Sequence, residues 1–325
     1  MIRLALAGTA HPHVDYVLSE LPHQPDVELV GVSEPDPAAA ARYAAGLGVP
    51  VYASHEELPD VDVIAVCGEY GARADVVVAA LHRGAHVLAD KPLCTTLADL
   101  DRITAAAQAA DRTVSVMFEK RGYPVTVAAR QLVADGILGD LALVASTGPH
   151  KLNYASRPDW FFDRARYGGI LGDLAVHDID LVLALSGASA GTVAGRAGNC
   201  SLPDRPGFSD NGAVLLGAGA VTATIEAHWM WPAASAYHGH YRMRLTGTAG
   251  TAELDWARGT LDVVTHDRDV WSPALGRPVR PAEEFLTALA EGRRPEVGTA
   301  ESLAATRIAL LAQLSADTGG EPQTW

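Results

Sequence analysis

Cysteine is scarce in this sequence, with three residues in 325 and no CxxC pair. Cys67, Cys94 and Cys200 are odd in number and widely spaced, which argues against a disulfide framework and against a cysteine-ligated zinc site. We therefore expect all three to be small buried hydrophobic side chains, in a protein of the cytoplasm.

Basic residues are also few, with 25 Lys and Arg against 39 Asp and Glu, for a formal net charge of −14. Such a balance repels phosphate backbones and anionic lipid surfaces. The chain has no apolar run near the length of about 18 residues that a membrane span needs. Its start, MIRLALAGTA, is too short for a signal peptide and is typical of a buried strand. We expect no nucleic-acid partner and no membrane partner.

The length of 325 residues predicts two domains at roughly 150 residues each. In the first part, short Val, Ile, Leu and Ala runs alternate with Ala-rich amphipathic stretches, which is the pattern of βαβ units. This predicts an α/β fold whose first domain, residues 1–119, is a doubly wound parallel sheet of the Rossmann type. The expected strands lie at residues 2–8, 27–34, 49–54, 62–68, 86–92 and 113–119.

The pattern changes after residue 119. Residues 191–266 alternate apolar and polar positions between Gly-rich turns, which indicates a mostly antiparallel sheet. We expect residues 120–325 to form an α+β domain with a large open sheet. Helices are expected at 124–135, 170–185, 281–292 and 299–319, with a strand at 141–146.

A dinucleotide-binding turn is indicated near the start. The first expected strand is followed by Gly8 and a helix, and the second strand ends in Glu34, an order that places a pyrophosphate at a helix N-terminus and a ribose diol on a carboxylate. The GxGxxG pattern is incomplete, because Ala10 and His13 stand at its second and third glycines. These residues alone therefore also fit a tight turn without a ligand.

His11 and His13 suggest a competing hypothesis. An HxH pair after a first strand is the spacing with which some metal-dependent hydrolases hold a metal on a barrel. A barrel requires eight βα units, whereas the second half of this chain is antiparallel in character. We therefore expect no metal.

Two later motifs carry more information. Asp90-Lys91-Pro92 ends the fifth strand, and Pro92 restricts the backbone of Lys91 so that its ammonium group points to one place at the ligand-binding edge of the sheet.

The string GGILGDLAVHDIDL places Asp173, His177 and Asp180 at i, i+4 and i+7, on one face of a helix. A carboxylate one turn from an imidazole fixes its tautomer and raises its basicity. Taken alone, the string also fits a capped, partly buried helix with a solvated polar stripe.

In combination, the DKP turn, the GGxxxDxxxHxxD string and the order of the domains resemble the glucose-fructose oxidoreductase, inositol dehydrogenase and MocA (Gfo/Idh/MocA) family over nearly the whole chain. The resemblance implies hydride transfer between NAD and a secondary alcohol of a sugar, cyclitol or glycoside. It also implies that His177 is the base, that Asp173 orients it, and that Lys91 polarises the reacting oxygen.

Glu34 falls on the ribose-binding acid of that family, and neither Pro35 nor Asp36 supplies an arginine for a 2′-phosphate, so we expect NAD to be preferred over NADP. Where the family usually has Thr-Pro-Asn after the fourth strand, this chain has Gly68-Glu69-Tyr70-Gly71, with Arg73 further on. The expected cofactor contacts are Gly8, Thr9, Ala10, His11, His13, Glu34, Cys67, Gly68, Glu69 and Lys91.

The substrate is expected to be a small polyhydroxylated molecule bound at the domain junction, because its hydroxyl groups need paired donors and acceptors and its C–H face an aromatic surface. The expected contacts are Lys91, Glu119, Arg121, His150, Lys151, Tyr154, Trp160, Asp173 and His177. Two alternatives remain: a redox-neutral, NAD-using lyase or glycosidase-type relative, and a non-catalytic sugar- or dinucleotide-binding protein.

An open antiparallel sheet needs cover on its second face, and a partner subunit is the usual cover in this family. We therefore expect a homodimer or homotetramer formed through the C-terminal sheet. The aromatic segment 227–242, AHWMWPAASAYHGHYR, fits either the substrate cleft or this interface.

Overall fold

The computed structural model describes the backbone of residues 1–325 and all side chains except those of residues 42–45. The chain forms two compact units. Unit 1 comprises Met1–Phe118, Ala165–Gly168 and Arg280–Thr306, and unit 2 comprises Glu119–Arg164, Gly169–Val279 and Arg307–Trp325. Unit 1 thus includes a C-terminal segment that a single division between residues 119 and 120 leaves out.

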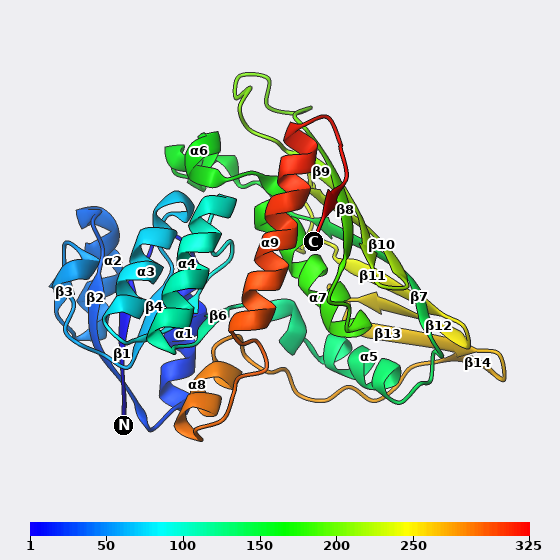
Figure 1. Cartoon of the computed structure of the whole chain (residues 1–325), viewed down its shortest axis with the longest axis horizontal. Helices are drawn as coiled ribbons and strands as arrows, with labels where there is room; N and C mark the ends of the chain where they lie inside the picture. Colours follow the sequence, from blue (N-terminus) through cyan, green and yellow to red (C-terminus); the bar gives the residue numbers. More distant parts are fainter. The chain divides into compact units, whose positions relative to one another are not determined.

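Unit 1 contains a six-stranded parallel sheet of order β3-β2-β1-β4-β5-β6, the Rossmann order (Figure 1). Its strands are β1 (Ile2–Ala7), β2 (Val27–Ser33), β3 (Val51–Tyr52), β4 (Val63–Val66), β5 (His86–Ala89) and β6 (Val114–Val116). The connecting helices are α1 (Val14–Glu20), α2 (Pro37–Leu47), α3 (Arg73–His82) and α4 (Leu97–Ala110). The predicted doubly wound domain is confirmed, although β3 is shorter than expected.

The core of unit 1 explains the apolar runs in its central strands. Leu4, Leu6 and Val63 are fully buried, because parallel sheets of this type are covered on both faces. Helix α8 (Glu283–Ala290) adds Phe285 and Leu286 to the same core. This apolar face is the reason that residues from the end of the chain belong to unit 1.

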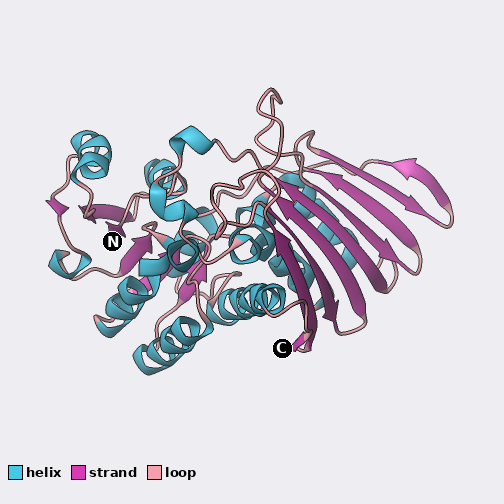
Figure 2. Cartoon of the chain, turned by 90° about the horizontal axis from the view of Figure 1, so that it is seen from above, coloured by secondary structure: helices cyan, strands magenta, loops and turns pink.

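Unit 2 contains a nine-stranded sheet of order β14-β13-β12-β11-β7-β10-β9-β8-β15, drawn as a broad fan in Figure 2. Its strands are β7 (Leu141–Pro149), β8 (Gly191–Gly198), β9 (Asn211–Ala218), β10 (Val221–His228), β11 (Arg242–Gly247), β12 (Gly250–Asp255), β13 (Thr260–Thr265), β14 (Arg268–Trp271) and β15 (Gln323–Thr324). Along the described backbone, β7 and β10 pair in parallel and the other neighbours are antiparallel. The expected mostly antiparallel sheet is confirmed.

One face of this sheet packs against helices. Helix α7 (Val176–Ser186) contacts β7, β9 and β10, and α5 (Pro124–Ala134) contacts β12 and β13, on the same side of the sheet in Figure 1. Strand β10 shows the result, because its residues are alternately buried and exposed. The remaining helices are α6 (Arg164–Tyr167) and α9 (Thr299–Asp317).

Among the described residues, no helix combines the length and the apolar composition that crossing a lipid bilayer requires.

Candidate active site

The loop after β1 is held tightly against the loop after β4. Gly8 has φ +81°, and a Cβ at this position would lie 2.4 Å from the Cα of Gly68. Only glycine accommodates both this conformation and this approach. Gly8 and Gly68 therefore lie side by side. Both are expected to contact the cofactor, and one ligand can touch both only if they are neighbours.

Glu34 is fixed at the end of β2 by the loop that holds Gly8. Its Oε2 accepts hydrogen bonds from the backbone nitrogen of Thr9 at 2.6 Å and from Thr9 Oγ1 at 2.7 Å, and its Oε1 accepts one from Asp36 N at 3.0 Å. A carboxylate offers about four acceptor positions, so one remains for a further donor. The three hydrogen bonds hold the Glu34 carboxylate in one orientation, with an acceptor position left for a ligand. The site therefore fits a ribose hydroxyl of a nicotinamide dinucleotide.

Asp90 is the centre of a buried cluster that joins the two loops. One of its oxygens, Oδ2, accepts from His11 Nδ1 and from Arg73 Nη2, each at 2.8 Å, while Oδ1 accepts from His13 Nδ1 at 2.7 Å. Burial alone would raise the pKa of Asp90, but His11, His13 and Arg73 hold it well below its usual range. Burial lowers the pKa of His11 to about 3 against the opposing effect of Asp90, so its imidazole is neutral near pH 7.

The same cluster contains the expected HxH pair. Ligand-type atoms of His11, His13 and Asp90 lie within 4.8 Å of one another. However, the guanidinium of Arg73 already binds the Asp90 carboxylate, and a metal cation there would face this positive charge. Three hydrogen-bond donors account for the geometry, and the absence of a metal stays a prediction.

Arg73 also forms hydrogen bonds with the backbone on both sides of Lys91. Its Nη1 donates to the carbonyl oxygens of Asp90 at 2.9 Å and Pro92 at 2.8 Å, and its Nε donates to that of Gly68 at 2.9 Å. The Lys91–Pro92 peptide bond is cis, and Lys91 is buried. Arg73 therefore fixes the turn that presents the Lys91 ammonium group. In the sequence, Arg73 stands only as part of a departure from the family pattern, and no local motif there indicates this role.

Two other expected cofactor contacts are engaged inside unit 1. Cys67 is fully buried, which raises the pKa of its thiol, and Glu69 forms an ion pair with Arg166. Cys94 is buried as expected. The expectation for Cys200 is wrong, because it is exposed: its backbone nitrogen is held by the carboxylate of Asp210 in a surface loop.

In unit 2, helix α7 is directly preceded by a π-helical turn, Leu171–Ala175, that carries Asp173. The turn follows Gly169, which has φ +106°, and the side chain of Gln313 in α9 accepts a hydrogen bond from Leu171 N at 3.2 Å. The predicted helix is confirmed, but its π turn was not predicted. Such turns often occur at functional sites.

The helix face that carries the motif is buried. Asp173 is 0 %, His177 1 % and Asp180 1 % exposed. The alternative of a solvated polar stripe is therefore wrong. Buried titratable groups need partners, because an isolated charge in the interior is unfavourable.

These partners come from the short segment 119–121. Lys120 Nζ lies 2.9 Å from both carboxylate oxygens of Asp178, and Arg121 forms a two-pronged ion pair with Asp180 at 2.6 Å. The sequence predicts that Arg121 contacts substrate; the structure shows its guanidinium in this buried pair, and the substrate contact stays a prediction. Removing one partner of such a pair costs about 3 to 5 kcal/mol.

The expected substrate loop joins the aromatic segment 227–242. The ring of His150 lies 5.3 Å from Trp229, 5.4 Å from His238 and 4.7 Å from Tyr241, measured between ring centres. The backbone nitrogen of Lys151 donates to His238 O at 2.9 Å. This segment of unit 2 therefore packs against the loop that carries His150 and Lys151.

Tyr154 and Trp160 take part in a neighbouring aromatic group. The ring of Tyr154 lies 4.9 Å from Phe162, and that of Trp160 lies 5.9 Å from Phe161. Trp160 is buried, whereas Tyr154 is 46 % exposed. Of the two, Tyr154 is the side chain that a ligand in solution reaches.

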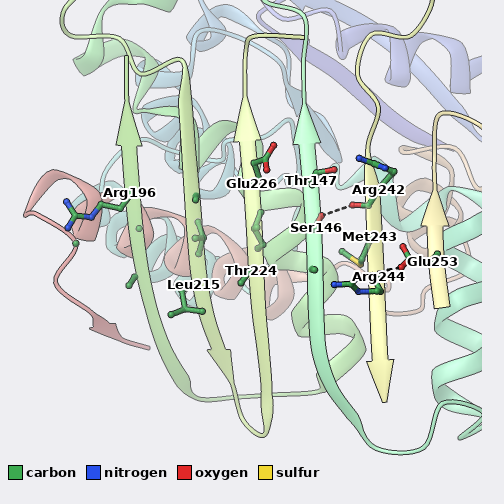
Figure 3. A pocket seen from close by; sticks show the side chains of 17 residues that line it. Ser146, Thr147, Arg196, Leu215, Thr224, Glu226, Arg242, Met243, Arg244 and Glu253 are labelled. Carbon is green, nitrogen blue, oxygen red and sulfur yellow. Dashed lines mark hydrogen bonds and ion pairs between the residues drawn. The ribbon is translucent and has the colours of Figure 1, made fainter. Parts of the chain in front are cut away.

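A cavity of about 690 Å³ lies over the sheet of unit 2, on the face that carries Thr224, Arg242 and Arg244 in Figure 3. Its lining combines small and apolar residues with charges of both signs. Among the described residues, those expected at the catalytic, cofactor and substrate sites do not line it. It is therefore a feature of the open sheet face rather than of the expected catalytic centre.

Comparisons with known proteins agree with both units. The model of an oxidoreductase family with an NAD-binding Rossmann fold matches residues 2–118, and that of the GFO/IDH/MocA C-terminal domain matches residues 126–253.

Among curated proteins, the chain is 28 % identical over 264 residues to the dTDP-3,4-didehydro-2,6-dideoxy-alpha-D-glucose 3-reductase of Streptomyces antibioticus, covering 79 % of this chain and 76 % of that protein. It is 26 % identical over 273 residues to the trans-1,2-dihydrobenzene-1,2-diol dehydrogenase of Mus musculus, covering 80 % and 77 %.

Among solved structures, a putative oxidoreductase from Erwinia carotovora atroseptica superposes with a TM-score of 0.88 at 29 % identity, covering 97 % of this chain and 99 % of that one. Levoglucosan dehydrogenase in complex with NADH and levoglucosan gives 0.85 at 18 % identity, with 99 % of each chain covered, and shows the shared fold.

Proposed function

Because this chain belongs to the Gfo/Idh/MocA oxidoreductase family, we propose that it transfers a hydride between NAD and a secondary alcohol of a sugar, cyclitol or glycoside. The observation that carries the proposal is the burial of Lys91, Asp173 and His177, each held by its own local structure. Two curated relatives that cover most of the chain act, by their names, on a dideoxy sugar and on a cyclic diol.

Bound NAD supplies the hydride acceptor, or NADH the donor in the reverse direction. Thr9 and Glu34 would hold it, with the Glu34 carboxylate accepting from a ribose hydroxyl. The loop between β1 and α1, closed by His11 and His13, would lie along the diphosphate.

The protein groups handle the proton and the developing charge. His177 takes the proton of the reacting hydroxyl, Asp173 favours the protonated imidazole, and Lys91 stabilises the negative charge that grows on the oxygen. Their burial strengthens these interactions, because charges interact more strongly away from water.

The test is a search for bound nicotinamide followed by a substrate screen. The purified protein is denatured and its small molecules are weighed by mass spectrometry. NADH formation is then followed with levoglucosan, myo-inositol and a set of aldoses. We expect NAD binding and NADH formation with at least one member of the panel. Bound nicotinamide without net NADH would favour the redox-neutral alternative, and a failure to bind NAD would favour the binding protein.

We also propose that a second copy of the chain covers the open sheet face. Leu143 and Leu215 are 53 % and 54 % exposed there. Arg196, Arg242 and Glu226 add charges of both signs, which the same surface of a second copy is able to complement. The cytoplasmic location stays a prediction from the sequence.

Light scattering coupled to size-exclusion chromatography tests this interface. We expect a dimer or tetramer for the parent and a smaller species for Leu215→Glu. Val127→Glu, which changes an exposed apolar residue on α5, is the matched control and should leave the mass unchanged. A monomeric parent would contradict the proposal.

A further inference from the structure

His177 has a carboxylate beside it that does not come from its own helix. The Nδ1 atom of His177 lies 3.3 Å from Oε2 of Glu119, with the two side chains 2 % and 11 % exposed. The sequence predicts that Glu119 contacts substrate, and the motif around His177 predicts acidic neighbours, Asp173 and Asp180, on the helix face of His177 alone. The structure therefore adds an acid from outside the helix next to the proposed base.

The backbone of Glu119 is held in place from several sides. It opens a short 3-10 turn, Glu119–Gly122, in which Lys120 and Arg121 form the buried ion pairs with α7. At the end of the turn, a Cβ on Gly122 would lie 2.0 Å from the carbonyl oxygen of Val279, so the turn packs closely against that segment. The position of the Glu119 backbone relative to α7 is therefore fixed.

Four of the other charged groups near His177 form ion pairs with one another. From the turn, Lys120 and Arg121 face Asp178 and Asp180, so that these four charges balance in pairs.

From its own helix, His177 is accompanied by Asp173. The strands that pack against α7 are β7, β9 and β10, and their buried faces carry apolar residues such as Val144, Val214 and Ile225. Glu119 is therefore the acid that faces Nδ1 from a packed element.

We propose that Glu119 is the counterion of His177: its carboxylate lies beside Nδ1, acts on the ring through its charge, and leaves Nε2 as the atom that acts on substrate. This rests on the proposed function for the identity of the base. During oxidation, the hydroxyl proton moves to Nε2 while the electron pair of the C–H bond leaves as hydride to bound NAD, and the carbon–oxygen bond becomes a carbonyl. The imidazolium that results faces the negative charge of Glu119, which stabilises it.

A histidine titration in the whole protein tests the proposal without substrate or cofactor. Proton–nitrogen correlation spectra of nitrogen-labelled protein resolve the imidazole signals of its 12 histidines, and His177→Gln identifies the signal of His177. Glu119→Gln keeps the shape and an acceptor oxygen but removes the charge. We expect the protonation midpoint of His177 to fall by about 1 to 3 pH units in this variant.

Two further variants complete the experiment. Glu119→Asp retains the charge and should restore most of the midpoint. Asp255→Asn is the matched control, because Asp255 lies 2.7 Å from Nε2 of another histidine, His240: it should leave the midpoint of His177 unchanged.

An unchanged His177 midpoint in Glu119→Gln, or equal shifts in Glu119→Gln and Glu119→Asp, would overturn the assignment. If the midpoint moves as expected but no member of the substrate panel yields NADH, the counterion assignment stands and the proposed function fails.

Discussion

The two units hold their candidate catalytic groups in different ways. In unit 1, Lys91 lies in a loop, and its position depends on one buried cluster of Asp90, Arg73 and the two histidines of the β1 loop, which we call the hub. Asp90 binds both histidines, and Arg73 binds the backbone around Lys91. In unit 2, His177 lies on a helix, and separate ion pairs fasten that helix to the segment 119–121. A loop needs a shared centre to become rigid, whereas a helix needs only side-chain contacts along one face.

The largest expected effects test the chemistry in each unit. Lys91→Met deletes the charge that stabilises the oxygen, and His177→Ala deletes the base. Each should lower kcat by a factor on the order of 10² to 10⁴ while NAD still binds. Asp173→Asn should cost less, because the base remains. Steady-state kinetics with calorimetry of NAD binding separate the two steps. A His177→Ala variant within about threefold of the parent would make His177 structural.

Next in size is the effect of breaking the hub. Arg73→Met leaves the buried Asp90 carboxylate without its guanidinium and releases the backbone around Lys91, so the free energy of unfolding should fall by about 3 to 5 kcal/mol. Urea denaturation measures the change. Arg102→Met is the matched control, since Arg102 pairs with Asp75 and Asp99 on the surface and should leave the midpoint unchanged. Equal midpoints for the two variants would contradict the hub.

Acid should destabilise unit 1 through the same cluster. The pKa of His11 is about 3 when folded against 6.5 otherwise, so the unfolded chain binds more protons between these values and stability falls as pH drops from 6.5 toward 3. The slope from this group is at most about 1.4 kcal/mol per pH unit.

The Asp90 pKa is lowered, so its contribution is present above the usual carboxyl range and is lost at lower pH. The free energy of unfolding, obtained from urea denaturation at several pH values in this range, should change less with pH for His11→Gln than for the parent. His266 is exposed, so His266→Gln should show the same pH dependence as the parent. A parent stability that rises on acidification would have the wrong sign.

The smallest expected effect concerns the cofactor. Glu34 repels a 2′-phosphate, so calorimetry should give NAD the lower Kd. Glu34→Ala should narrow the difference between NAD and NADP by weakening NAD binding. Tighter binding of NADP by the parent would refute the expectation.

Much of this could be predicted from local patterns. The βαβ rhythm, the mostly antiparallel second sheet and the helix that carries Asp173 and His177 follow from periodicities of a few residues, which chain neighbours set among themselves. The pairing of Lys120 with Asp178 could not be predicted in this way, because these residues are 58 positions apart and both also suit a solvated surface.

The sequence by itself therefore determined the order of the elements and the candidate groups Glu34, Lys91, Asp173 and His177, since each follows from turn chemistry or helical spacing. Only the tertiary structure decided which groups are engaged elsewhere. It assigned Arg121 to Asp180, brought Glu119 next to His177, exposed Cys200 and joined residues 280–306 to unit 1. The physical reason is that burial and ion pairing depend on which distant segments pack together, and this information is spread over the whole chain.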